Sequence, residues 1–321
     1  MAAITLKQGD PGYIDIVSGL GADAADKSID ALRVRYNSHP LQGGQWFETV
    51  DASGMGNEWK VSTYGTILEL PRESDDSDYI PMAIPWRGFK KAFASQQYQL
   101  GTQILRSMIE DQIKNVATKM AGGLMNAYRV LQEHSFAYTL NNSQTAAIVG
   151  ADGVSLANTA HPFERRQQGT WSNVSTAAAL THANYNIMRL AIRKRTDEYG
   201  DRQPLMPRQL VIPVDLETKA KEIFQSEKVD DTALNTKNVI KGNVEPFVYN
   251  WFTSTTKWML WSNRDLLSED KGLHHVVMAP ATIRPTTGRD KSSNVINGKY
   301  IRTRFVDGFS HGKAWQDNSG A

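Results

Sequence analysis

One long amphipathic segment constrains the fold of this chain more than any other feature. Between Thr102 and Glu133, apolar residues recur at steps of four and three positions, as on the buried face of an α-helix. At about 1.5 Å per residue, the segment predicts a helix on the order of 45 Å long. Gly122 and Gly123 lie within it, and each costs about 1 kcal/mol relative to alanine, so we expect a bend or a close backbone contact there. The apolar stripe consists of Ile109, Ile113, Val116, Met120, Leu124, Ala127 and Leu131.

Extended chain is predicted before this helix. The segment 1–58 mixes short apolar clusters with Gly and Asp, which predicts an arm with little core of its own, either frayed or laid across a neighbouring subunit. Residues 59–70 alternate β-favouring side chains and predict a strand, and a second strand is predicted at 79–86. The acidic stretch 71–78 between them is a predicted turn. The two strands therefore form a hairpin that projects from the body.

The hairpin is expected to meet other subunits. A two-stranded ribbon is only marginally stable in water, so one of its faces should be buried on another chain. Large aromatic residues dominate interface energetics, and the acidic turn is suited to meet Lys or Arg of a neighbour. On the first strand, Trp59, Val61 and Thr63 share a face. The candidate contacts between subunits are Trp59, Tyr64, Asp75, Asp76, Asp78, Tyr79 and Trp86.

Beyond residue 140 the pattern changes to alternating strands and helices, as in an α/β unit. Thr181 is placed to begin a helix and Gly200 to end it. Asp215 is a predicted N-cap for a helix at 216–225. The inward residues of the two helices are predicted to be Tyr185, Met188, Ile192, Ala220, Ile223 and Phe224. Strands are predicted at 209–212, 246–249, 257–261, 274–278 and 300–306.

The chain offers few residue patterns for catalysis. It has no cysteine, which excludes disulfides, thiolate nucleophiles and sulfur-based zinc sites and suits a reducing cytoplasm. The Gly-Met-Gly segment at 54–56 lacks the third glycine and the context of a dinucleotide fingerprint, so we interpret it as a turn. His274 and His275 are adjacent in a predicted strand and point to opposite faces, so they cannot share one metal, while His134 and His161 stand alone. We predict no catalytic residue, no metal site and no cofactor.

The charged clusters also have structural explanations. Glu110 and Asp111 fall near the start of the predicted long helix, where acidic side chains offset the helix dipole. The pair at 165–166 and the run at 193–195 are basic but lack interleaved aromatic residues, so we interpret them as solvated surface. With 36 Lys and Arg against 34 Asp and Glu, no global basic field favours nucleic acid or membrane. There is no signal peptide, and no apolar run approaches the roughly 20 residues of a membrane span, so we expect a soluble protein.

The order of these parts resembles the major capsid proteins of tailed bacteriophages, whose fold is named after phage Hong Kong 97 and is shared by encapsulin shells. An arm, an extended hairpin, a long helix, an α/β unit and a late strand follow one another as they do in that family. The likeness covers roughly residues 59–300. Single motifs are loose, and their order and spacing carry the resemblance. The motifs lie at 98–111, 152–162, 180–181, 201–204, 209–213, 238 and 258–260.

The resemblance implies the fold class α+β, with a Hong Kong 97-type capsid fold. Its parts are an N-terminal arm at 1–58, an E-loop hairpin and entry to the P-domain at 59–100, the P-domain spine helix at 101–140, an α/β A-domain at 141–289, and a return strand to the P-domain with the C-terminus at 290–321.

The resemblance also implies a function and partners. The chain would be a major capsid protein whose pentamers and hexamers close into an icosahedral virion shell, after assembly in the host cytoplasm. Double-stranded DNA would be contacted without sequence specificity, and no membrane is involved. The short arm leaves no room for a long fused scaffolding segment, which implies a separate scaffolding protein, besides a portal and room for a decoration protein. The Lys–Asn cross-link of some relatives has no identifiable partner residues here.

Two other functions are compatible with parts of the pattern. An encapsulin-like shell has the same fold and encloses a protein cargo in place of a genome. A soluble α/β enzyme would need a nucleophile motif such as G-x-S-x-G, and the nearest string, at 17–21, has the wrong spacing and context. Genes for a portal and a terminase beside this one would favour the phage capsid over the cargo shell.

Overall fold

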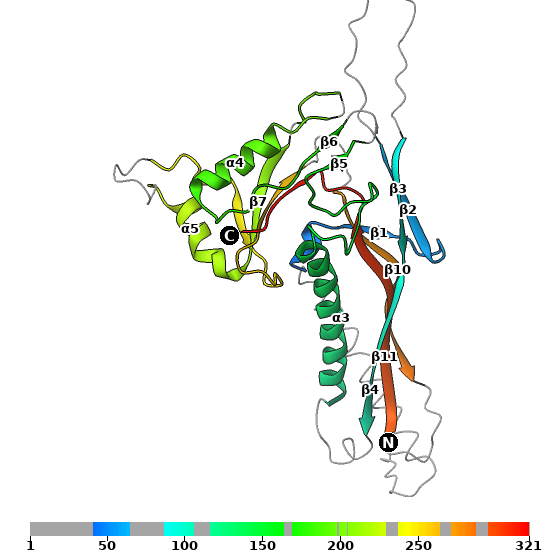
Figure 1. The fold of residues 1–321 in the computed structure, drawn as a ribbon. Coiled ribbons are helices and arrows are strands. Elements are labelled where there is room, and N and C mark those ends of the chain that lie inside the picture. Colours follow the sequence, from blue (N-terminus) through cyan, green and yellow to red (C-terminus); the bar gives the residue numbers. More distant parts are fainter. Residues whose placement is uncertain are drawn as a thin grey trace, which may run out of the picture.

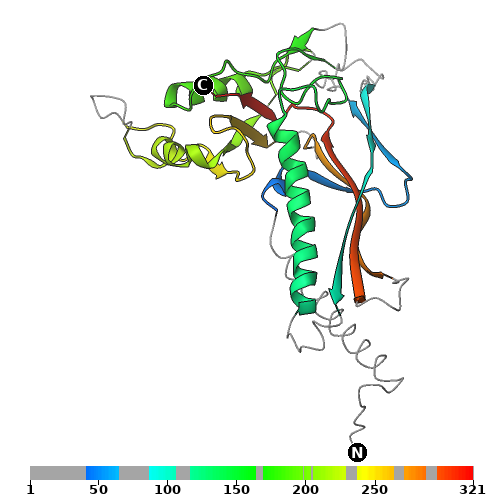
Figure 2. The same cartoon turned by 60° about the horizontal axis from the view of Figure 1, so that its bottom comes forward.

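The computed structural model shows an elongated unit joined to a rounder α/β unit at one end (Figures 1 and 2). Within the described residues, strands form two four-stranded and two two-stranded sheets. The same residues also form α-helices, and this mixture of helices and strands confirms the predicted α+β class. The structure describes residues 41–64, 87–105, 116–163, 169–197, 199–203, 205–228, 237–263, 271–286 and 295–320.

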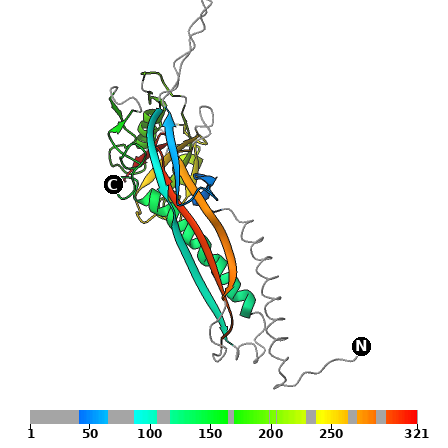
Figure 3. The ribbon, with the colours of Figure 1, turned by 90° about the vertical axis from the view of Figure 1, so that its right-hand side faces the viewer.

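The elongated unit is built on one four-stranded sheet, here called the spine sheet. Its strand order is β1 (Glu48–Asp51), β10 (Leu273–Thr286), β11 (Val295–Phe309) and β4 (Gln96–Leu105). β1 runs parallel to β10, and the other neighbours are antiparallel. The three long strands lie alongside one helix, which covers one face of the sheet (Figure 3). The other face of the sheet is therefore available to other parts of the chain.

The long helix is present, but its position along the chain is shifted from the prediction. Helix α3 spans Val116–Asn141, whereas residues 102–105, predicted as helix, continue strand β4 and pair with β11. Thr and Ile are β-branched at this position and are readily accommodated in a strand. Ile109 and Ile113 lie outside the described residues. The predicted domain boundary at 101–140 thus begins in a strand.

The buried face of α3 is also turned relative to the predicted stripe. Leu124 is buried as expected, whereas Ala127 and Leu131 are only half-buried. The face contains Gln132 and Glu133, which pattern reasoning assigns to solvent although both are buried here. Its buried members are Leu124, Met125, Gln132, Glu133, Phe136, Ala137, Thr139 and Leu140.

Gly123 gives a direct test of helix propensity. It is exposed, and a Cβ built there would meet nothing within 4 Å, so the close backbone contact expected at this glycine is wrong. We expect Gly123→Ala to stabilise the subunit by about 1 kcal/mol in urea denaturation. Gly43→Ala is the opposing control, because its Cβ would lie 2.7 Å from the Phe136 Cβ, which should destabilise by about 1–3 kcal/mol. A stability unchanged or lowered by Gly123→Ala would contradict this reading of the helix.

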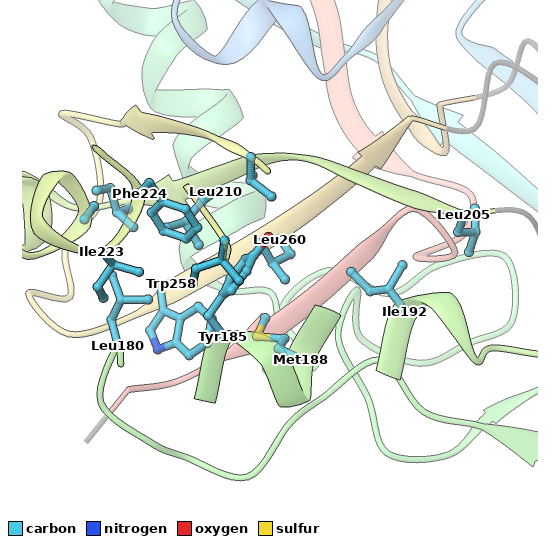
Figure 4. Packing of buried hydrophobic residues seen from close by; sticks show 14 residues of the cluster. Leu180, Tyr185, Met188, Ile192, Leu205, Leu210, Ile223, Phe224, Trp258 and Leu260 are labelled. Atoms are coloured by element: carbon cyan, nitrogen blue, oxygen red, sulfur yellow. The ribbon is translucent and has the colours of Figure 1, made fainter. Parts of the chain in front are cut away.

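The rounder unit contains the second four-stranded sheet, here called the α/β sheet. Its order is β12 (Trp315–Asn318), β9 (Trp258–Asn263), β7 (Met206–Ile212) and β8 (Glu245–Val248). β7 and β8 are parallel, and the other pairs are antiparallel. Two helices, α4 (His182–Arg193) and α5 (Glu217–Gln225), pack on one face of this sheet through a continuous apolar core (Figure 4). Four short elements complete the described fold: β5 (His161–Pro162), β6 (Thr170–Trp171), η1 (Gly43–Gln45) and η2 (Val214–Leu216).

The predicted helix ends agree with the structure at Thr181 and differ from it at Gly200 and Asp215. Thr181 caps α4, since its hydroxyl accepts the Asn184 N–H at 3.2 Å. Gly200 does not end this helix, which stops at Arg193; Gly200 instead occupies a later turn with φ +90°. Asp215 lies in the short 3-10 turn η2 and makes no cap for α5. The inward residues predicted for α4 and α5 are all buried in the shared core.

The strands predicted after residue 208 are confirmed, but the last strand was missed. The segments at 209–212, 246–249, 257–261, 274–278 and 300–306 overlap β7, β8, β9, β10 and β11. After β11 the chain leaves the spine sheet, and β12 pairs with β9 at the edge of the α/β sheet. Within the range 290–321, β11 returns to the spine sheet, whereas the C-terminal residues, for which no strand was predicted, join the other sheet. All four residues of β12 are buried.

The segment just before the hairpin is packed into its own subunit. Trp46 and Phe47 are almost fully buried among residues of both sheets and α3, and β1 pairs with β10. The expectation that the arm at 1–58 has little core of its own is therefore wrong for these residues. None of the helices in the described ranges combines the length and apolarity needed to cross a membrane.

Candidate functional site: the hairpin base and the sheet junction

The predicted hairpin begins with two paired strands, here called the hairpin base. β2 (Glu58–Tyr64) pairs antiparallel with β3 (Arg87–Ala94), and Trp59 lies opposite Phe93. The partner in the described residues is thus the segment directly after the predicted strand 79–86, which itself lies outside them. The Gly-Met-Gly segment at 54–56 forms the turn before β2, with both glycines at positive φ.

One face of the hairpin base packs on the spine sheet of the same subunit. Trp59 and Val61 are half-buried and Thr63 is buried, whereas Glu58, Lys60 and Tyr64 are exposed, which confirms the predicted face. The Trp59 ring lies 5.4 Å from the Phe93 ring and 5.3 Å from the His274 ring, centroid to centroid. Trp59 therefore anchors the hairpin base within its own subunit.

The other candidate contact residues lie at the open end of the hairpin or beyond it. Tyr64, the last residue of β2, is 59% exposed and remains a candidate for contact with a neighbour. The others lie outside the described residues and remain predictions: Asp75, Asp76, Asp78, Tyr79 and Trp86.

The two adjacent histidines of β10 point to opposite faces, as predicted. His274 faces the hairpin base, and its Nε2 lies 2.9 Å from the Ser310 hydroxyl. His275 faces α3, where its ring pairs with the Asp307 carboxylate and lies 3.4 Å from the Gln132 amide. His274 thus contacts the hairpin base on one face of the spine sheet, and His275 contacts α3 on the other face.

A buried carboxylate fastens α3 to the start of the described chain. Glu133 accepts the backbone N–H groups of Gln42 and Gly43. The Tyr249 hydroxyl lies 3.5 Å from the same carboxylate. Burial, and next the negative charge of Glu133, raise the pKa of Tyr249 far above its ordinary value. These bonds fix Gln42 and Gly43 against α3.

A buried ion pair joins the end of α3 to β12 and to the residue just before β9. Lys257 donates to the Leu140 carbonyl at 2.7 Å and to the Ser143 hydroxyl at 2.6 Å. Its Nζ lies 3.6 Å from Oδ2 of Asp317, which is completely buried. Burial lowers the pKa of Lys257, and the charge of Asp317 opposes this shift. The pair and its hydrogen bonds hold the C-terminal strand against the helix.

A second buried cation secures the same strand from the other side. Arg195 is only 7% exposed, and its guanidinium donates to the Trp315 carbonyl at 3.3 Å and to the Gln316 side chain at 2.6 Å. It also lies 4.9 Å from the centre of the Trp171 ring. The interpretation of the run 193–195 as solvated surface is therefore wrong for Arg195, whereas the pair at 165–166 lies outside the described residues.

His161, expected to stand alone, has two polar partners. It is fully buried, with Nδ1 2.7 Å from the Asp152 carboxylate and Nε2 3.0 Å from the Asn173 amide oxygen. The Asn173 amide nitrogen donates to the Leu156 and Gly312 carbonyls. This cluster ties the loop after α3 to the segment leading into β12.

Together these contacts form what we call the sheet junction, the buried network that fixes the two sheets against each other. Sequence reasoning missed it because its members are polar, scattered along the chain and part of no recognisable motif. In the parts of the chain that the structure describes, no three His, Cys, Asp or Glu side chains gather as a metal site would require. The junction consists of Glu133, Asp152, His161, Asn173, Arg195, Lys257 and Asp317.

An elongated sheet with a spine helix, a hairpin anchored on it and an α/β unit joined to it by buried contacts define the class of shell-forming capsid subunits. The family model described as phage capsid protein matches residues 89–308. The chain belongs to this phage capsid protein family. No match was found among proteins of curated function.

Solved structures show the same fold at very low sequence identity. The capsid structure of cyanophage P-SCSP1u has 7% identity and a TM-score of 0.55, with 86% of each chain covered. The capsid of the native GTA particle has 10% identity and a TM-score of 0.54, covering 88% of this chain and 91% of that chain. Microbacterium phage Oxtober96 has 8% identity and a TM-score of 0.52, covering 87% and 90%. The Hong Kong 97-type fold implied by the sequence resemblance is confirmed.

Proposed function

We propose that this major capsid protein assembles into a closed icosahedral shell around the double-stranded DNA of a tailed phage. One observation carries the proposal: the family match extends from β3 of the hairpin base to β11, and so includes the spine helix and the α/β sheet. In this proposal the spine sheet with α3 is the P-domain, the α/β sheet with α4 and α5 is the A-domain, and the hairpin is the E-loop.

The proposed assembly uses the rigidity of the subunit. A-domains gather around five-fold and six-fold axes, while P-domains and hairpins overlap neighbouring subunits. Closed symmetry satisfies the same contact patches on every copy, and the sheet junction holds those patches at a fixed angle. The nearly balanced charge, 36 basic against 34 acidic residues, suits a wall that contacts DNA without reading its sequence. A separate scaffolding protein, a portal, a decoration protein and assembly in the host cytoplasm belong to the same proposal.

Electron microscopy of the purified full chain tests the proposal. We expect negatively stained samples to contain pentamers, hexamers or closed shells, with matching masses by mass photometry. Particles isolated from infected cells should contain double-stranded DNA. A chain that stays a monomer at all concentrations and salt conditions would contradict the proposed assembly, and shells filled with a protein cargo would contradict the genome-enclosing role.

A further inference from the structure

The spine sheet has one covered face and one partly bare face. Helix α3 covers the first through Leu124 and Met125, which pack against Ile301 of β11. Because side chains alternate along a strand, Arg302 and Arg304 point to the opposite face. We call this opposite side the open face of the spine sheet; in Figure 3 the helix lies behind the sheet.

The hairpin base covers only one end of the open face. Its Trp59, Val61 and Phe93 pack against Val276 of β10 and Val306 of β11. Past Val306 toward the other end of the sheet, the described residues provide no apolar cluster on this face.

Three arginines occupy the uncovered part of the open face. Residues paired directly across neighbouring strands share a face. Arg284 lies opposite Tyr300, two residues from Arg302 and four from Arg304 on the adjacent strand. Arg284 and Arg302 are exposed, and Arg304 is half-buried. We call these three residues the arginine strip.

The arginine strip is held in place by neutral partners. Arg302 donates to the Gln97 side chain at 3.0 Å. Arg304 donates to the Asn57 side chain at 2.6 Å and to the Ser95 hydroxyl at 2.9 Å. Amides and hydroxyls orient a guanidinium but do not neutralise its charge.

Carboxylates of the described part of the spine sheet are engaged elsewhere. Glu48 lies beside His274 under the hairpin base, Asp51 accepts from Ser53, and Asp307 pairs with His275 on the face covered by α3. Among the described residues, no ion pair involves a member of the arginine strip. The strip therefore has a positive charge that a partner can neutralise.

We propose that the arginine strip is a docking surface for an acidic segment of a second copy of this chain, namely residues 73–78. This inference deepens the proposed function and rests on it, since it names both sides of one contact in the shell. The segment reads Glu-Ser-Asp-Asp-Ser-Asp, with four carboxylates and no cation. It is the densest acidic stretch of the sequence.

The spacing of charges supports this pairing. Arg302 and Arg304 are two residues apart on one strand, which places their Cα atoms about 6.6 Å apart. In an extended peptide, Glu73 and Asp75, or Asp76 and Asp78, recur at the same spacing. Guanidinium groups bind carboxylates bidentately, so two or more charge-assisted pairs can form at once.

The decisive experiment measures binding of a synthetic peptide of residues 70–80 to the unassembled full-length subunit by isothermal titration calorimetry. We expect binding that weakens with added salt and that falls by about tenfold or more in the double variant Arg284→Glu, Arg302→Glu. Both side chains are exposed, so the fold should tolerate the change. Arg304 is left unchanged because it also braces the hairpin base. The matched control is Arg193→Glu with Arg208→Glu, exposed arginines outside the strip.

A charge exchange in the full chain completes the test. The double variant should fail to form shells, and adding Asp75→Lys with Asp76→Lys should restore them, whereas the control variant should assemble normally. Unchanged peptide binding or no rescue would overturn the docking proposal while leaving the shell function intact. If the double variant assembles normally but loses binding to duplex DNA, the docking proposal is also overturned, because the arginine strip would then bind nucleic acid. Peptide binding by a chain that never assembles would instead count against the proposed function alone.

Discussion

Replacing Asp317 by alanine is expected to destabilise the folded subunit by about 3–5 kcal/mol, because the change leaves the Lys257 ammonium buried without its counter-charge. Asp317 is completely buried, and its carboxylate also accepts from the Ser143 hydroxyl and, at 3.2 Å, from the Gln144 amide. The loss should appear as a lower urea midpoint and a lower Tm of the unassembled subunit. Shell yield should fall with it, since β12 would no longer be held against α3.

Two further variants separate the charge effect from the loss of packing. The double variant Lys257→Met, Asp317→Leu removes both charges and should recover much of the lost stability, since apolar replacements of buried pairs are often tolerated. Lys221→Ala removes an exposed pair with Glu217, both about half exposed, and should change stability by less than about 0.5 kcal/mol. A small effect of Asp317→Ala would show that Lys257 is satisfied by its carbonyl and hydroxyl partners alone.

Periodicity predicted those elements whose buried face is apolar. Tyr185, Met188 and Ile192 of α4 recur at helical spacing and are all fully buried. Strand β2 showed its alternation, and Trp59 and Val61 face the subunit as expected. In these elements local pattern and tertiary burial agree, so the pattern sufficed.

Elements that bury polar groups could not be predicted from pattern. β12 reads Trp-Gln-Asp-Asn, which resembles a polar loop, yet all four residues are buried. The Asn318 amide donates to the Thr176 carbonyl, and the Gln316 amide to the Ser175 hydroxyl, partners about 140 residues away. Helix α3 has the same property at Gln132 and Glu133. Burial of such groups depends on tertiary hydrogen bonds, which leave no periodic trace in the sequence.

The candidate contact site was predictable only in part. The acidic stretch 73–78 is visible in the sequence as a charge cluster. The arginine strip is not, because Arg284 belongs to a different strand from Arg302 and Arg304, and their shared face depends on the register between β10 and β11. An irregularity between Ala279 and Thr282 shifts that register, and bulges of this kind cannot be inferred from alternation. Side chains that are distant in the sequence are thus brought onto one face by the pairing of β10 with β11.

Trp46→Ala is expected to destabilise the subunit by about 3–5 kcal/mol, the range for deleting a large buried side chain. Trp46 is fully buried, and its ring makes edge contacts with Phe247, Tyr249 and Trp315 at centroid distances of 5.3, 5.3 and 5.8 Å. Its Nε1 donates to the Gln209 side chain at 2.9 Å. The same residue thus packs against β7, β8 and β12 of the α/β sheet while standing two residues before β1 of the spine sheet.

Removing the Trp46 side chain should therefore change the angle between the two sheets as well as the stability of the subunit. Met55→Ala, at an exposed residue of the turn before β2, is the control and should leave both unchanged. We expect Trp46→Ala subunits to unfold at lower urea and, where they remain folded, to form aberrant or open shells in electron micrographs, because closure depends on a fixed orientation of the repeated contact patches. Regular shells of normal size from a destabilised Trp46→Ala chain would show that lattice contacts, and not the packing of Trp46 between the two sheets, set that orientation.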